Sequence, residues 1–134
     1  MDINDYSRLA LRTANLQHSI YLDAPHAALG IGGEAGEILD HVKKVVFNHR
    51  AMDREHLIAE LGDLIWYCNL LIEVLGTSWS EVLEANIAKL EARYPNLRFE
   101  ADKANQRDTD AEQAAIRKAA FVNTTARTIA GARI

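Results

Sequence analysis

The chain has 134 residues, of which 49% are apolar, and its 19 acidic and 15 basic side chains give a net charge of −4. This length and apolar content predict a single domain with a core of its own, which a shared oligomer core would help to stabilise. The excess of acidic residues argues against general nucleic-acid binding. No apolar run approaches the ~20 residues of a membrane span. The chain has a single cysteine, Cys68, which excludes an intrachain disulfide.

The N-terminal segment predicts a helix over residues 4–20, because apolar side chains recur at helical spacing from Leu9 to Ile20. We expect this helix to be broken within residues 21–25. Pro25 cannot continue a helix, and it disfavours helical geometry in the residue before it.

A second helix is predicted over residues 26–47, with an apolar stripe from Ile31 to Val45 at steps of three and four. Glycines inside it are unexpected, because each costs up to ~1 kcal/mol relative to alanine. Three explanations stay open: a neighbouring helix approaches the bare backbone, a bulky ligand does so, or the helix breaks locally. These glycines are Gly30, Gly32, Gly33 and Gly36.

A third helix is expected from Asp53, a suitable N-cap, to about Leu75, where Gly76 ends it. Its apolar residues surround the helix on nearly all sides, which is typical of a helix in the middle of a structure. We therefore expect it to be the most buried helix of the protein.

A fourth helix begins with a capping box, in which Ser78 is the N-cap and Glu81 the third helical residue, and Pro95 closes it. Beyond residue 100 the apolar pattern weakens. Thr109, or the residue before it, caps a short helix through Ala120, while residues 122–134 have too few periodic apolar side chains to fold alone. We expect that end to be mobile or used in subunit contacts.

No strand-like alternation occurs, so the predicted class is all-α, a four-helix arrangement with a C-terminal appendage. Charge is uneven along the chain: residues 1–102 hold 16 acidic and 9 basic side chains, whereas residues 103–134 hold 3 acidic and 6 basic side chains. The basic end is too sparse for a nucleic-acid-binding arm. The start of the chain lacks the pattern of a signal peptide, and we expect a cytoplasmic protein.

Two carboxylate couples stand on the second and third predicted helices, Glu34 with Glu37 and Glu60 with Asp63. Residues three apart project from nearly the same face of a helix, so two packed helices would gather all of them. Such crowded negative charge requires cations or bound protons. Oxygen ligands without thiolate or imidazole suit Mg²⁺ or Mn²⁺, so the pattern predicts a metal site.

Each polar residue also has a simpler interpretation. An isolated Glu-x-x-Glu is usually a solvated helix face, but the second couple lies on a helix with little polar surface. His41 lies on the carboxylate stripe, where a lone histidine more often hydrogen-bonds a neighbour than binds metal. Trp66 and Tyr67 more often serve as core or interface residues than as a stacking surface for a nucleobase.

These couples, together with the Asn-x-x-Lys-Leu-x-x-Arg-Tyr-Pro pattern over residues 86–95, resemble the MazG-like, all-α nucleoside triphosphate pyrophosphohydrolases. The resemblance covers roughly residues 6–100 and implies a MazG-like domain over residues 1–100, with residues 101–134 as a partly helical or disordered extension. It also implies hydrolysis of (deoxy)nucleoside triphosphates between the α- and β-phosphates, and assembly as a homodimer or homotetramer.

The resemblance further implies roles for single residues. Glu34, Glu37, Glu60 and Asp63 would be the catalytic Mg²⁺ ligands, and an unligated carboxylate such as Glu37 would take the proton of the attacking water. The residues that would face the triphosphate are Lys44, Asn86, Lys89 and Arg93.

Two other classes remain open. A ferritin-like di-iron or di-manganese bundle also gathers carboxylates, but it requires Glu-x-x-His on two helices, a spacing that this sequence lacks. The second is a non-catalytic helical oligomer or adaptor, in which the carboxylates only pair with Lys43, Lys44, Lys89 or Arg93.

Overall fold

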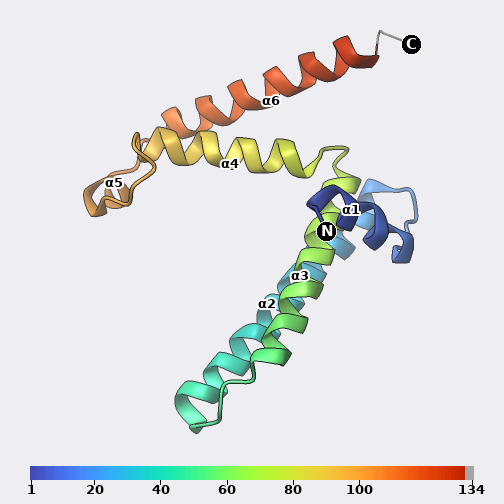
Figure 1. The fold of residues 1–134 in the computed structure, drawn as a ribbon, viewed down its shortest axis with the longest axis vertical. Coiled ribbons are helices and arrows are strands. Elements are labelled where there is room, and N and C mark those ends of the chain that lie inside the picture. The colour runs from blue at the N-terminus through green and yellow to red at the C-terminus, as the bar shows by residue number, and fades with distance from the viewer. Residues whose placement is uncertain (132–134) are drawn as a thin grey trace. The chain divides into compact units, whose positions relative to one another are not determined.

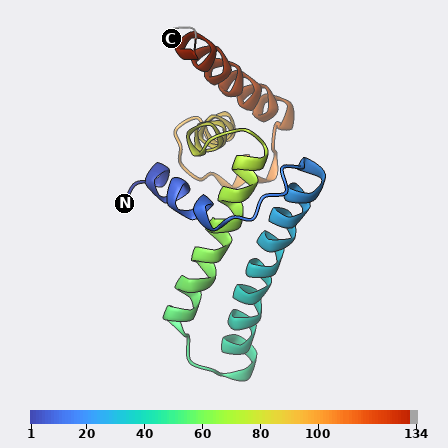
Figure 2. The ribbon, with the colours of Figure 1, turned by 90° about the vertical axis from the view of Figure 1, so that its right-hand side faces the viewer.

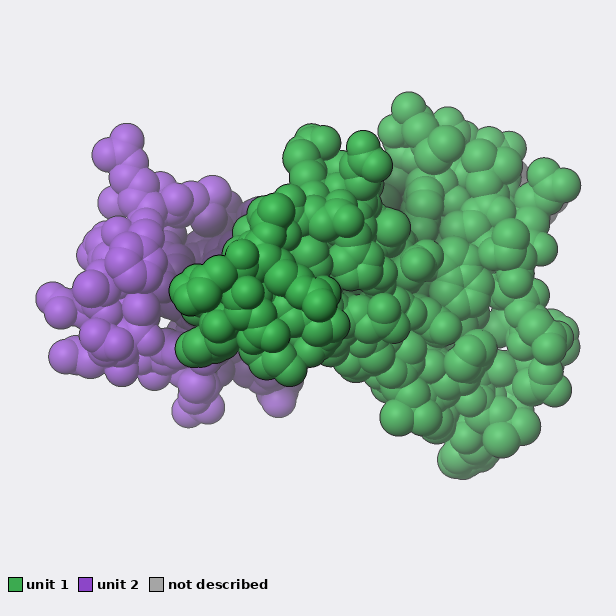
Figure 3. Space-filling view, turned by 90° about the horizontal axis from the view of Figure 1, so that it is seen from below, with its two compact units in different colours: residues 1–77 green, residues 78–134 purple. Residues whose placement is uncertain are grey.

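Two long antiparallel helices, α2 (Ile20–Asn48) and α3 (Arg54–Val74), lie side by side as a hairpin (Figures 1 and 2). The computed structural model describes the backbone of residues 1–131 and the side chains of residues 1–120. All regular elements in that part are helical, which confirms the predicted all-α class. The chain divides into two compact units, Met1–Thr77 and Ser78–Ile134, coloured separately in Figure 3.

The N-terminal helix is shorter than predicted. Helix α1 (Ile3–Ala10) passes into a single 3₁₀ turn, η1 (Leu11–Thr13), so the prediction of a helix over residues 4–20 is wrong beyond that turn. The Trp66 indole N–H of α3 donates to the last carbonyl of α1 (3.3 Å) and to Thr13 Oγ1 (2.9 Å). These bonds tie the end of the segment to α3, which is a packing role for the tryptophan.

The predicted break within residues 21–25 and the predicted helix start at residue 26 are also wrong, because α2 begins at Ile20 and Pro25 lies inside it. The buried Asp23 carboxylate accepts the backbone N–H groups of Gln17 (2.9 Å) and Ser19 (3.1 Å), and thereby satisfies donors just before the helix. Proline at this position removes one helical bond, that to the Tyr21 carbonyl. Tyr21 is 87% exposed, so water can take the place of the missing donor.

The glycines of α2 differ in what surrounds them. A Cβ on Gly30 would lie 2.5 Å from Cγ of the Tyr67 ring, so this glycine admits the close approach of α3. Apart from the neighbouring residues and backbone of α2 itself, no atom of the described residues lies within 4 Å of the corresponding position on Gly32, Gly33 or Gly36. Because α2 runs through all of them, the explanation by a local helix break is wrong.

Helix α3 begins and ends as predicted. Asp53 caps it by accepting the backbone N–H of His56 (3.0 Å), and Gly76 follows it with φ of +64°. Its outer surface is apolar and open, however, because Ile58 is 51% and Leu61 49% exposed. Among the helices whose side chains are described, α3 still has the most buried residues, Glu60, Asn69 and Leu70, as expected, although the single chain does not enclose it on all sides.

The second unit contains α4 (Trp79–Arg93), α5 (Ala101–Asn105) and α6 (Thr109–Gly131), and α4 and α6 lie side by side (Figure 1). The predicted capping box is confirmed: Ser78 Oγ accepts the Glu81 N–H, and a Glu81 oxygen accepts the Ser78 N–H.

Helix α6 extends past the predicted end at Ala120, because no proline or glycine interrupts the chain before Gly131. The expectation of subunit contacts by residues 122–134 lies outside the side chains that the structure describes. Over residues 1–131, none of the helices has the length and apolar character needed to cross a membrane.

Candidate metal centre

The α2–α3 hairpin brings together carboxylates from both helices. One oxygen each from Glu34, Glu37 and Glu60 lies within 4.8 Å of the other two. Glu34 and Glu37 share a face of α2 because they are three residues apart, and α3 places Glu60 opposite them. Glu60 is 9% exposed, whereas Glu37 is open to solvent, so the cluster has a buried side and an accessible side.

The cluster is electrostatically strained as a set of free carboxylates. Burial, the contact with the Glu60 carboxyl and the negative charge of Glu37 all raise the pKa of Glu34. A cation placed among the three groups would reverse the last two effects. Because all the donors are hard carboxylate oxygens, the residues present fit Mg²⁺ or Mn²⁺.

Asp63, the fourth predicted ligand, is exposed and lies outside this group of three. Its charge still reaches two neighbours. After burial, it is the main cause of the raised pKa of Tyr6 on α1, and it contributes to the raised pKa of Glu34. A role for Asp63 as a metal ligand remains a prediction.

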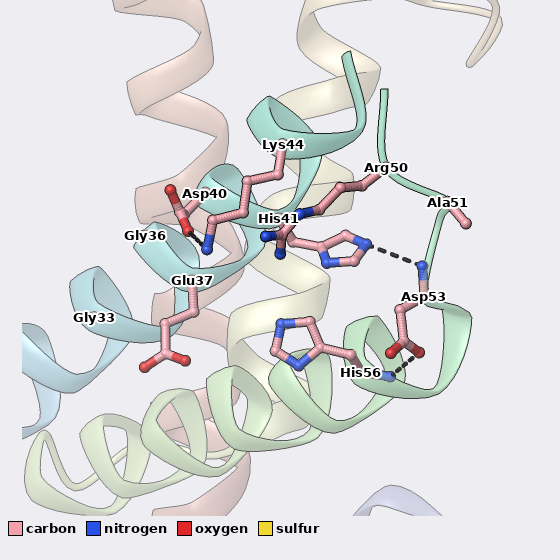
Figure 4. Close-up of a pocket in the computed structure, with 10 residues that line it drawn as sticks. All are labelled: Gly33, Gly36, Glu37, Asp40, His41, Lys44, Arg50, Ala51, Asp53 and His56. Atoms are coloured by element: carbon pink, nitrogen blue, oxygen red, sulfur yellow. Dashed lines mark hydrogen bonds and ion pairs between the residues drawn. The ribbon is translucent and has the colours of Figure 1, made fainter. Parts of the chain in front are cut away.

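A cavity of about 730 Å³ opens beside the cluster, with Glu37 in its wall (Figure 4). Two cations also line it: Lys44 on α2, and Arg50, which points from the α2–α3 linker back toward α2. Lys44 is paired with Asp40, and the ammonium groups of Lys43 and Lys44 lower the pKa of Asp40 to about 2. Arg50 forms no ion pair with any residue whose side chain is described.

Two histidines line the same cavity: His41, which the sequence placed on the carboxylate stripe, and His56, to which it gave no role. His41 Nε2 accepts the backbone N–H of Asp53 (3.1 Å), which confirms the expectation that His41 hydrogen-bonds a neighbour. His56 Nδ1 lies 3.2 Å from Glu60 Oε1. The spacing of four residues between His56 and Glu60 on one helix was a signal that could have identified this contact.

The remaining predicted substrate residues, Asn86, Lys89 and Arg93, lie on α4 in the second unit, and their role at the site stays a prediction. The Arg93 guanidinium donates to both oxygens of Glu112 on α6 (2.9 and 2.8 Å), as does Arg107 (3.2 and 2.7 Å). These bonds hold the pKa of Glu112 well below its usual range and raise the pKa of Arg93. Sequence reasoning missed Glu112, which lies beyond the motif.

The protein is therefore helical and has a candidate metal centre. The α2–α3 hairpin supplies the carboxylates of this centre, and a cavity opens beside them. The family model of the MazG nucleotide pyrophosphohydrolase domain matches residues 26–98, more than half of the chain, and the chain belongs to this family. The matched residues include all four predicted carboxylates.

A curated relative matches the chain over a segment of similar length. "Gene 37 protein" of Mycobacterium phage L5 is 38% identical over 72 residues, which are 51% of this chain and 63% of that protein. The similarity thus spans less than two thirds of the relative's length. No solved structure matches the chain.

Proposed function

We propose that this protein is a Mg²⁺-dependent hydrolase of (deoxy)nucleoside triphosphates that releases the nucleoside monophosphate and pyrophosphate. The observation that carries the proposal is the convergence of Glu34, Glu37 and Glu60 inside the region that matches the family. Hydrolysis of a phosphoanhydride requires charge neutralisation and alignment more than a protein nucleophile, and a carboxylate site supplies these by holding divalent cations.

In this proposal, Glu34, Glu37, Glu60 and Asp63 hold Mg²⁺. The bound ion supplies neutralisation of phosphate charge and a lowered pKa of the attacking water. Glu37 is the accessible member of the cluster and faces the cavity, so it is placed to accept the proton of that water. The anhydride bond between the α- and β-phosphates breaks, and pyrophosphate leaves.

The cations assigned to the triphosphate are Lys44, Lys89 and Arg93, with Asn86 as a neutral hydrogen-bonding partner. Lys44 has the strongest support, because it lines the cavity together with Glu37. Its pairing with Asp40 keeps the side chain in the cavity wall when no anion is bound.

The test is pyrophosphate release from a panel of canonical and modified nucleoside triphosphates with Mg²⁺. Glu37→Gln should abolish turnover and weaken binding of the cation. Glu73→Gln is the matched control, because Glu73 is an exposed glutamate at the far end of α3. A folded wild-type protein that releases no pyrophosphate from any nucleotide would refute the proposal and leave the adaptor class as the better description.

We also propose a homodimer or homotetramer. Apolar side chains remain open on the hairpin, including Leu29 (77% exposed), Leu39 (69%), Ile58 (51%) and Leu61 (49%). Several large apolar side chains exposed on one hairpin favour a surface that a partner covers. Light scattering on the purified protein tests the proposal, and a monomer at micromolar concentration would contradict it.

A further inference from the structure

The histidines of the cavity occupy equivalent positions on the two helices of the hairpin. His41 follows Glu37 by four residues on α2, and His56 precedes Glu60 by four residues on α3. Each histidine is thus about one turn from a cluster carboxylate, toward the linker. Their ring centroids are 5.1 Å apart, and Figure 4 shows both rings beside the cavity.

One linker residue anchors both histidines. The Asp53 backbone N–H donates to His41 Nε2 (3.1 Å), and the Asp53 carboxylate accepts the backbone N–H of His56 (3.0 Å). His41 is therefore fixed by its ring, while His56 is fixed by its backbone and retains its ring for another contact. That contact is with Glu60, from Nδ1 to Oε1 at 3.2 Å.

We propose that His56 is a positioning residue for Glu60, held in place by Asp53 and His41; the consequence for metal binding rests on the proposed function. Glu60 is the most buried carboxylate of the cluster, and its side chain, 11% exposed, has little access to water as an alternative partner. Nδ1, which can carry a proton, lies 3.2 Å from Oε1, close enough to hold the carboxylate against repulsion from Glu34 and Glu37. Such a second layer of contacts orients metal ligands in many sites.

The histidines are not counted among the metal ligands. The contacts of His41 Nε2 and His56 Nδ1 use one nitrogen of each ring, so they do not decide this point. The cluster of mutually close ligand atoms among the described residues contains only carboxylates. A positioning role requires a donor at position 56, which asparagine can supply, whereas ligation by His56 Nε2 would require the imidazole itself, and this difference can be tested.

The test is Mn²⁺ binding without nucleotide, measured by calorimetry or electron paramagnetic resonance. His56→Leu removes the donor, and His56→Asn has nearly the same shape but supplies an amide N–H close to the position of Nδ1. Loss of a second-layer contact typically weakens metal binding by about 10- to 100-fold. We therefore expect His56→Leu to bind Mn²⁺ about tenfold more weakly and His56→Asn to remain within about threefold of the wild type. Arg54→Ala, in the same turn of α3, is the control and should bind as the wild type does.

Equal Mn²⁺ affinity of the leucine variant and the wild type would overturn the inference, and so would equal weakening of the leucine and asparagine variants. In a Glu60→Gln background the difference between the two variants should disappear. Should His56→Leu lose helix content, His56→Ala replaces it in the same comparison. If the Mn²⁺ affinity depends on position 56 as expected but the wild type cleaves no nucleotide, the proposed function alone is refuted. If the enzyme is active but substitutions at position 56 leave the Mn²⁺ affinity unchanged, this inference alone is refuted.

Discussion

Alanine at Gly30 would force a methyl group into the Tyr67 ring. Its Cβ would lie 2.5 Å from Cγ of that ring and closer still to Cδ1 and Cε1. Cγ joins the ring to the Cβ of Tyr67, so the whole Tyr67 side chain must move. The Trp66 and His26 rings pack edge-on against the Tyr67 ring, with centroid distances of 4.9 and 5.8 Å, and they restrict this movement. Overpacking of this kind costs roughly 2–3 kcal/mol, the upper part of its usual range. Alanine recovers about 1 kcal/mol of helix propensity, which leaves a net loss of roughly 1–2 kcal/mol.

Gly32→Ala is the matched control, because it lies in the same helix and no described atom outside the local turn of α2 lies within 4 Å of the new Cβ. It should gain about 0.5–1 kcal/mol from propensity alone. The difference between the two variants therefore isolates the steric cost of roughly 2–3 kcal/mol. Urea unfolding followed by circular dichroism at 222 nm measures both free energies.

Tyr67→Ala supplies the decisive comparison. When the ring is absent, the two alanine variants should differ by less than about 0.5 kcal/mol, because the steric term has gone. If Gly30→Ala is as stable as Gly32→Ala in the wild-type background, α2 and α3 do not approach each other as described. The packing that aligns the carboxylates would then be wrong as well.

Three further predictions concern contacts away from the cluster. Trp66→Phe loses the donor to Thr13 and should lower the free energy of unfolding by about 1 kcal/mol in urea titrations; an unchanged value would mean that this bond is not made in solution. Asp23→Ala should lower helix content, as measured by circular dichroism, because donors before α2 lose their acceptor; unchanged helicity would contradict this role. The lowered pKa of Glu112 makes its ion pairs stabilising above the ordinary value of 4.5 and progressively weaker as pH falls below it. Glu112→Gln should thus be less stable than the wild type at pH 7, with a difference that shrinks in acid, whereas the exposed Glu91→Gln should show no such trend.

Contacts between residues close in sequence could be predicted from the sequence. The Ser78 capping box and the Asp53 cap connect residues three apart, and Gly76 ends α3 through its own backbone freedom. The pairing of Glu34 with Glu37 on one face follows from the helical repeat. For these features local chemistry is sufficient, whatever the rest of the chain does.

Other features depend on partners that spacing does not identify. Pro25 lies within α2, whose start is joined to the preceding residues by the Asp23 carboxylate, and neither feature follows from the spacing of the sequence. The partner of Arg93 proved to be Glu112, 19 residues further along the chain. Only the packing of α4 with α6 brings that pair together.

By itself, the sequence determined that this protein is helical, that it carries acids on two helix faces, and which family it resembles. The tertiary structure alone decided that Glu60 joins Glu34 and Glu37, that Asp63 lies outside this group of three although its charge still reaches Glu34, and that His56 contacts Glu60. The physical reason is that helical periodicity sets the direction of a side chain relative to its own axis. The rotation and offset between two helices are set instead by packing, here by Tyr67 against the bare backbone of Gly30.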